Sequence, residues 1–315
     1  GLFVLGRYNY LLFHSIAEMF SIVIACAIFM VAWNARSVLE NHYLLFVGMA
    51  YLFVGVLDFT HTLAYKGMGV FRDNTADPAT QMWIAARFLE SISLLSAGFF
   101  IRRRLRTGLA MAGFSIVTGF FLLAVFRWDI FPDCFVEPGG LTAFKKISEY
   151  AVAVIFLAAG GLLFSARKSF DPEVFRLLLA SILISTAAEL IFTLYTDVYG
   201  LINLLGHFLK IVSFYLIYRA IIVTGLVRPQ RILFRSIQQS EAFLNSVVMS
   251  SLSGMYLYDL AKKTNVFINP EYTKFTGYSL DDIQAMKGTE FFDLFHPEDR
   301  AEVASHWEQL MKAAD

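Results

Sequence analysis

Residues 43–65 read YLLFVGMAYLFVGVLDFTHTLAY, an apolar run that is interrupted near its end by Asp58 and His61. A helix needs about 20 mainly apolar residues to cross a bilayer, so this run is long enough to span one. An ionisable side chain inside a membrane costs about 2.5–3.5 kcal/mol on insertion scales, and Asp58 and His61 must therefore face protein. The run predicts a membrane-spanning helix with one polar stripe.

Six more runs of this kind precede residue 226, at 9–33, 81–101, 109–128, 141–165, 176–196 and 200–224. The chain of 315 residues is 57% hydrophobic and 17% charged, with a mean hydropathy of +0.59. A soluble domain carries about 25% charge. We therefore expect an all-α membrane protein with a bundle of seven transmembrane helices. A count of six would follow if the short break at 102–108 or the one at 197–200 were not real.

Basic residues are unevenly distributed among the loops. They gather at 34–42, 102–108 and 166–176 and again after the seventh run, whereas the opposite loops hold Lys66 and Arg72. Loops rich in Lys and Arg stay in the cytoplasm. This predicts a membrane protein with its amino terminus outside and its C-terminal part in the cytosol.

Ionisable residues occur at a similar depth in six of the seven runs, in the half nearer the outside. Many lie three or four positions apart within one run, a spacing that puts them on one helix face. Such faces turn away from lipid, which predicts a polar chamber that opens outwards. The predicted ligand-binding residues are Glu18, Arg87, Glu90, Lys145, Glu149, Glu189 and Lys210, and the predicted metal ligands are His14, Asp58, His61 and His207.

Several occupants suit this set of side chains. Imidazole and carboxylate groups together suit a transition metal ion such as Zn, Cu or Fe. Asp58 and His61 have the carboxylate-x-x-His spacing of di-iron bundles, although those bundles use two such pairs. Haem held by two histidines and a small polar or anionic solute held by Arg87, Lys145 and Lys210 are alternatives. The same groups can also be buried ion pairs that only fix the packing of the helices.

Residues 226–249 are predicted to form a linker helix. Leu233, Ile237, Ser240, Leu244 and Val247 alternate steps of four and three, the seam of a short coiled coil that would join two chains as a parallel homodimer. An amphipathic helix that packs on its own domain has the same pattern.

Residues 250–315 change to short strands and short helices. Met255–Asp259 and Asn265–Asn269 read as a hairpin, and Asn269-Pro270 and Ser279 read as helix starts. The run FINPEYTKFTGYSLDDI, with FFDLFHPEDRAEV after it, resembles the first half of a PAS domain. A PAS core is a five-stranded antiparallel sheet, so the resemblance implies a partial α+β PAS domain without its last three strands. A two-stranded piece is marginal in water, and we expect this end to be poorly ordered on its own.

The membrane part also resembles a family. The phrases FHSIAE (Phe13 to Glu18), YLFVGVLDFTHTLAYKGMGVF (Tyr51 to Phe71) and QMWIAARFLES (Gln81 to Ser91) are similar to the third type of bacterial membrane-associated sensor domain, over about residues 8–225. Members of that family precede PAS domains, histidine kinases and diguanylate cyclases. The resemblance implies a non-catalytic sensor domain at 1–225 whose output enzyme lies outside this chain.

Other functions have weaker support in the sequence. An intramembrane zinc hydrolase would use a pair of histidines on the last span, but Ile211 stands four residues after His207. A retinal protein would use Lys210, whose surroundings differ from the rhodopsin pattern, and a transporter does not explain the attached PAS domain. The formal net charge of zero gives no reason to expect nucleic acid binding. Cys26 and Cys134 form no disulfide framework.

Overall fold

The computed structural model describes residues 8–37, 42–71, 75–194, 201–259, 264–286 and 293–314. The loop residue Arg72 lies outside these ranges. The structure also does not describe the side chains of Leu233 and of the arginines after the seventh run, Arg228, Arg231 and Arg235. The chain divides into two compact units, Gly1–Arg231 and Ile232–Asp315. The division falls inside the predicted linker, 226–249.

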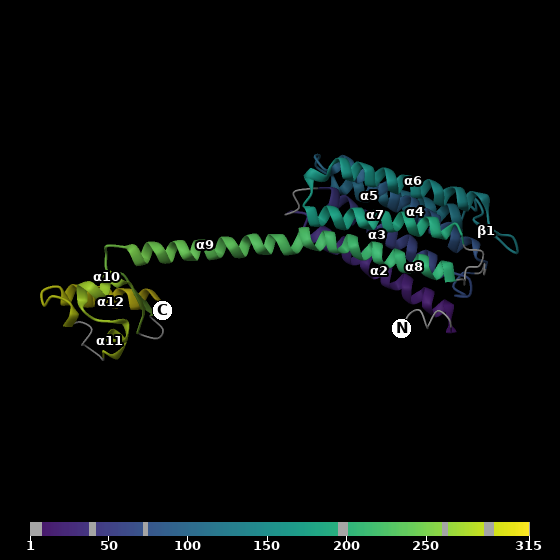
Figure 1. Cartoon of the computed structure of the whole chain (residues 1–315). Coiled ribbons are helices and arrows are strands. Elements are labelled where there is room, and N and C mark those ends of the chain that lie inside the picture. The colour runs from purple at the N-terminus through teal and green to yellow at the C-terminus, as the bar shows by residue number, and fades with distance from the viewer. Residues whose placement is uncertain are drawn as a thin grey trace. The chain divides into compact units, whose positions relative to one another are not determined.

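The first unit is a helical bundle, and Figure 1 shows its helices side by side. Within the described ranges, seven helices are long and apolar enough to cross a membrane, which confirms the predicted count. Residues 101–106 separate the third from the fourth, so the short loop between them is real. The helices are α2 (Tyr10–Asn34), α3 (His42–Ala64), α4 (Asp77–Ser96, extended by the 3-10 turn η1, Ala97–Phe100), α5 (Thr107–Phe126), α6 (Ala143–Ser165), α7 (Pro172–Phe192) and α8 (Leu201–Ile222).

Helices α2, α6 and α7 begin where the sequence has capping residues. Asp171 caps α7, because its Oδ1 accepts a hydrogen bond from the Glu173 N–H at 2.8 Å while Pro172 occupies the first turn. Asp77 opens α4 and also accepts from the N–H groups of Cys134 and Phe135 at 2.6 and 2.7 Å. These bonds hold the α5–α6 connection, with its short strands β1 (Phe135–Val136) and β2 (Gly140–Leu141), against the start of α4.

Helix α3 is central and α5 is peripheral. In the apolar window of α3, 72% of the residues are buried, against 22% for α5. Helices α2 and α3 pack closely at Gly48, where an added Cβ would lie 2.3 Å from the Cβ of Ala32. Small residues allow transmembrane helices to approach in this way. The polar residues of α3 are consequently surrounded by protein on most sides.

Helices α7 and α8 are joined by buried hydroxyl groups. The Oγ of Ser213 lies 2.8 Å from that of Ser181 and 2.6 Å from that of Ser185. All three serines are at most 6% exposed. Hydrogen bonds between helices are one of the forces that hold membrane bundles together.

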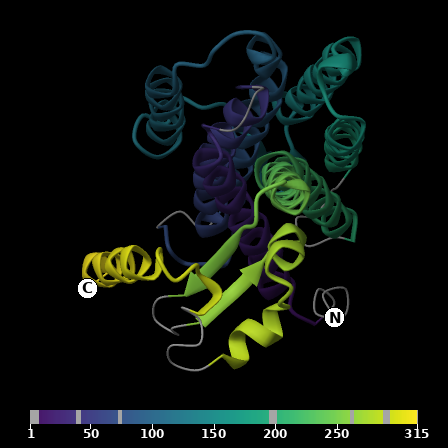
Figure 2. The ribbon, with the colours of Figure 1, turned by 90° about the vertical axis from the view of Figure 1, so that its left-hand side faces the viewer.

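Helix α8 is followed by a π-helical turn, η3 (Val223–Val227), and by the linker helix α9 (Arg228–Ser250). The second unit then contains an antiparallel pair, β3 (Tyr256–Asp259) and β4 (Thr264–Ile268), which confirms the predicted hairpin and appears as two adjacent arrows in Figure 2. Helices α10 (Pro270–Thr276) and α11 (Leu280–Ala285) begin after Asn269 and Ser279, the predicted caps. The last helix is α12 (Arg300–Ala314).

We expect Ser213→Ala to lower the free energy of unfolding of the bundle by about 1 kcal/mol, because it removes hydrogen bonds between α7 and α8. Unfolding in mixed detergent micelles measures this change. Ser165→Ala is the control, since its hydroxyl bonds to the Gly161 carbonyl of its own helix. Equal losses in the two variants would contradict a specific role for the α7–α8 contact.

Candidate functional site

The predicted polar residues turn towards the inside of the bundle. Each of the eleven is buried, and the most exposed of them, His61, is 5% exposed. They come from six helices, and α5 contributes none of them. The ionisable side chains at this depth therefore avoid lipid, as expected in a membrane protein.

Lys210 on α8 joins two other helices. Its Nζ lies 2.6 Å from Oε2 of Glu18 on α2 and 3.0 Å from Oδ2 of Asp58 on α3. One ammonium group thus holds two carboxylates from helices that adjoin α8. Hydrogen-bonded ion pairs of this kind satisfy charges that lipid cannot.

Asp58 continues the network to α4. Its Oδ1 accepts a hydrogen bond from Arg87 at 2.9 Å, and Arg87 is also paired with Glu90 on its own helix. The Tyr51 hydroxyl donates to Glu90 at 2.6 Å and so returns the chain of contacts to α3. We call Glu18, Lys210, Asp58, Arg87 and Glu90 the ion-pair chain.

Two residues that the sequence analysis did not select complete this chain. The ring of Trp83 lies near two cations, with its centre 4.9 Å from the Arg87 guanidinium and 4.7 Å from Nζ of Lys210. Cations over an aromatic face are stabilised by its quadrupole. Trp83 and Tyr51 carry no formal charge, so a search for ionisable residues passed over both. Trp83 stands four residues before Arg87, so the two side chains lie on one helix face. This spacing could have indicated Trp83 from the sequence.

The three membrane histidines form a second group beside the ion-pair chain. His61 Nδ1 lies 2.7 Å from the carbonyl oxygen of Ala79, and its Nε2 lies 3.2 Å from Nε2 of His14. A carbonyl only accepts, so Nδ1 of His61 donates, and Nε2 of a neutral His61 is then an acceptor for the His14 N–H. This leaves Nδ1 of His14 with a lone pair, and that buried atom has no hydrogen-bond partner among the described residues.

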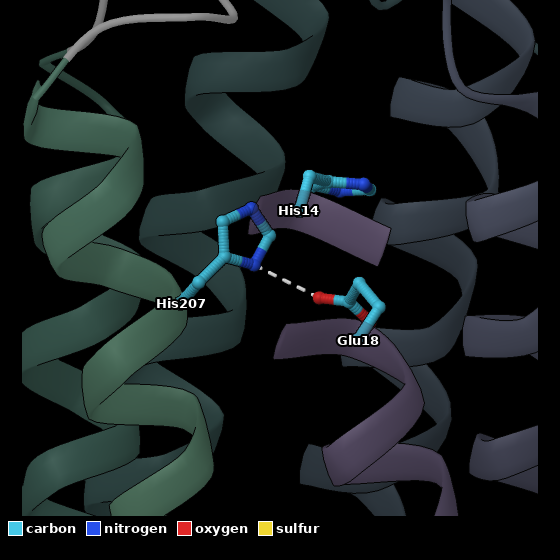
Figure 3. Close-up of side chains that lie close together, drawn as sticks. All are labelled: His14, Glu18 and His207. Atoms are coloured by element: carbon cyan, nitrogen blue, oxygen red, sulfur yellow. Dashed lines mark ion pairs between the residues drawn. The ribbon is translucent and has the colours of Figure 1, made fainter. Parts of the chain in front are cut away.

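His207 connects the histidines to the ion-pair chain. Its Nδ1 lies 2.8 Å from Oε1 of Glu18, the contact drawn in Figure 3. Figure 3 also shows that His14 and Glu18 come from one helix, α2, and His207 from α8. One ligand atom from each of these three buried residues lies within 4.8 Å of the others, a grouping that can hold a metal ion.

The other predicted metal ligands lie differently. Asp58 is bound to Arg87 and Lys210, and no contact joins it to a histidine among those that the structure describes. His61 contacts His14 and stands next to the group of three. Glu18, predicted to bind a ligand, takes the carboxylate place beside His14 and His207 instead.

Lys145, Glu149 and Glu189 lie on α6 and α7. Lys145 pairs with Glu149 four residues later, as their spacing predicted. Glu189 is 2% exposed, and its Oε2 has no hydrogen bond among the described residues. Counted together, the eleven residues include five carboxylates and three Lys or Arg side chains. The buried cluster therefore has two more acidic than basic groups, which protons or a bound cation must offset.

A small cavity lies beside these groups. It has a volume of about 20 Å³, and its lining includes His61, Trp83, Lys145, Asn203 and His207. A water molecule needs at least roughly 10–15 Å³, whereas pockets for drug-sized ligands are about 300–1,000 Å³. The described side chains thus leave room for about one water or one ion, and they do not fit a haem.

Comparison with known protein families supports two assignments. A model described as a membrane-associated sensor domain matches residues 5–229, and a model described as a PAS fold matches residues 265–315. Both are sensory regions of signalling proteins that carry out no catalysis themselves. No curated protein and no solved structure matches the chain.

We expect Asp58→Asn to lower the free energy of unfolding by about 3 kcal/mol, because it removes the charge shared by Arg87 and Lys210. Glu137→Gln is the control, since it breaks the half-exposed ion pair with Lys66 and should change stability by at most about 1 kcal/mol. Unfolding of both variants in the same detergent measures the difference. Equal effects would show that the ion-pair chain does not stabilise the bundle.

Proposed function

The chain belongs to the family of membrane-associated sensor domains, and from this we propose that it is the sensory input region of a bacterial transmembrane receptor. In this proposal the bundle detects a transition metal ion at His14, Glu18 and His207 and transmits binding through α8 to the PAS region. The observation that carries it is the close grouping of two imidazoles and one carboxylate from two helices inside a membrane bundle.

The chemistry of the three residues suits such an ion. Imidazole and carboxylate are ligands of Zn, Cu and Fe. The lone pair on Nδ1 of His14 is buried without a hydrogen bond in the described part of the chain, so one donor atom is ready. His61, bound to the Ala79 carbonyl, would fix the ring of His14 as outer partners of metal ligands do. A divalent cation would also offset the two surplus negative charges of the buried cluster.

Binding would alter the contact between α2 and α8. The three ligand atoms lie within 4.8 Å of one another, whereas ligands of a tetrahedral zinc at about 2.0–2.1 Å stand about 3.3 Å apart. Glu18 and His207 would exchange their direct 2.8 Å contact for bonds to the ion, and His14 would draw closer to both. A ligand shifts a conformational equilibrium only through such a difference between two states.

The same two helices also touch at their opposite ends. A Cβ added to Gly225 would lie 2.9 Å from the Cβ of Ala35, just after α2. Movement of α8 against α2 at His207 would therefore reach a tight contact at Gly225, inside the π-helical turn η3 that precedes the linker. Single π-helical turns often occur at functional positions in helices.

The remaining parts of the proposal concern topology and output. The basic loops favour an inner-membrane protein with its amino terminus outside and its PAS region in the cytosol. The output would be a histidine kinase or a cyclic-di-GMP enzyme beyond this chain. Helix α9 exposes Ile237, Leu244 and Val247 by 55%, 59% and 47%, which supports pairing with a second copy through the predicted seam.

We expect His207→Ala to reduce Zn²⁺ binding by the purified chain at least about a hundredfold, and His61→Ala to reduce it about 10–100-fold, because His61 only orients His14. Equilibrium dialysis with Zn²⁺ and the absorption spectrum of bound Co²⁺ provide the readouts. His296→Ala removes an exposed imidazole of the second unit and serves as the control. Unchanged binding in His207→Ala, or an equal loss in His296→Ala, would refute the metal site.

We expect Ser240→Cys to form a disulfide between two chains in membranes, and Gln238→Cys, on the other side of α9, to do so at least about tenfold more slowly. Both variants carry Cys26→Ser to remove an exposed thiol. Burial raises the pKa of the Cys134 thiol to about 12, so that residue stays unreactive. Non-reducing electrophoresis measures the product, and equal rates at the two positions would contradict the seam.

A further inference from the structure

The bundle has a strongly basic pocket at the end where helices α2, α4 and α8 have their C-termini. Arg36, from the connection after α2, and Arg102, Arg103 and Arg104, from the connection after α4, line one pocket of about 610 Å³. His42, the first residue of α3, lines it as well. We call this hollow the arginine pocket.

Among the described residues that line the arginine pocket, Arg36, Arg102, Arg103 and Arg104 carry the formal charges. No carboxylate is among the described residues that line it. Nδ1 of His42 is buried and has no hydrogen-bond partner within the described ranges. Four guanidinium groups around one space repel each other unless an anion joins them, and each offers a fork of donors that matches the oxygens of a phosphate.

The backbone adds to the positive potential. Helix α3 begins at His42, and helix α5 begins at Thr107, directly after the basic loop. The residue before α5, Arg106, makes no side-chain capping hydrogen bond. The first N–H groups and the dipole of a long helix favour an anion near its N-terminus. Two such helix starts therefore adjoin the same pocket.

Part of the pocket is preorganised. Arg36 donates a hydrogen bond to the carbonyl oxygen of Trp33 at 2.8 Å, and its guanidinium lies 4.9 Å from the centre of the Trp33 ring. These contacts hold one arginine in place before any ligand arrives. If the arginines served only as a topology signal, they could all point into solvent. The connections after α2 and after α4 instead line one common pocket.

We propose that the arginine pocket binds the phosphate group of an anionic phospholipid. The pocket lies where spans end and begin, since η1 ends at Phe100 and α5 starts at Thr107. This is the level of the lipid headgroups in a bilayer. The apolar side chains of Ile101 and Leu105 also line the pocket, which suits a ligand whose phosphate continues into acyl chains.

A lipid at this place would touch both connections at once. Arg36 follows the helix that carries His14 and Glu18, and Arg102 follows the helix that carries Arg87 and Glu90. The headgroup would thus hold the inner ends of α2 and α4 together. The lipid composition of the membrane would thereby influence the two helices that carry much of the polar cluster.

The test compares two triple variants of the full chain with equal losses of charge. The triple Arg102→Gln/Arg103→Gln/Arg104→Gln removes three cations from the pocket. The triple Arg167→Gln/Lys168→Gln/Arg176→Gln removes three cations at the same end of the bundle, two from the α6–α7 connection and one from the first turns of α7. Native mass spectrometry during titration with phosphatidylglycerol counts bound lipids, with phosphatidylcholine as reference. We expect the first triple to weaken phosphatidylglycerol binding by about tenfold or more and the second by less than about threefold.

Equal weakening in the two triples, or no preference for phosphatidylglycerol in the unaltered chain, would overturn the proposal. The phosphate group could come from a lipid or from free inorganic phosphate, and the Tm of the chain in phosphatidylcholine nanodiscs distinguishes the two. If added inorganic phosphate raises this Tm as much as phosphatidylglycerol does, the pocket binds free phosphate and the lipid assignment is wrong. Arg36→Gln leaves the loop after α4 unchanged, and it tests the pocket independently in case the triple variant does not fold. It should also weaken lipid binding while the Tm in phosphatidylcholine stays the same.

Discussion

The chain of ion pairs from Glu18 through Lys210, Asp58 and Arg87 to Glu90 is the contact on which the rest of the bundle depends. Lipid offers no partner to these charges, so the helices that carry them must meet. The chain joins α2, α8, α3 and α4, and Tyr51 returns it to α3. The ion pairs therefore fix how each helix is rotated about its axis and how far it is shifted along that axis. Contacts between apolar side chains alone do not fix both.

The remaining helices follow from this arrangement. Helix α7 is bound to α8 by the hydroxyls of Ser181, Ser185 and Ser213. Helix α5 carries no member of the polar cluster and lies at the edge, with most of its span unburied. The same asymmetry places the basic loop before α5 at the border of the bundle, where the arginine pocket opens.

Polar side chains lie near both ends of α2. His14 and Glu18 lie near its first turns beside His207, and Arg36 follows its last turn. One end has surplus negative charge and suits a cation, whereas the other has surplus positive charge and suits an anion. In the two proposals taken together, α2 would connect a cation site with an anion site.

Much of this protein follows from the sequence alone. The seven apolar runs, the helix starts at Asn269 and Ser279, the hairpin and the set of buried ionisable residues were all predicted, because each depends on local composition or on spacing within one helix. The pair Lys145–Glu149 was correct for the same reason. Partners on different helices were not predictable: Asp58 pairs with Arg87 and Lys210, and Glu18 pairs with Lys210 and His207 of α8. Which residues meet across the bundle depends on helix rotation and depth. Those are decided by contacts between different helices, such as that of Gly48 on α3 with Ala32 on α2.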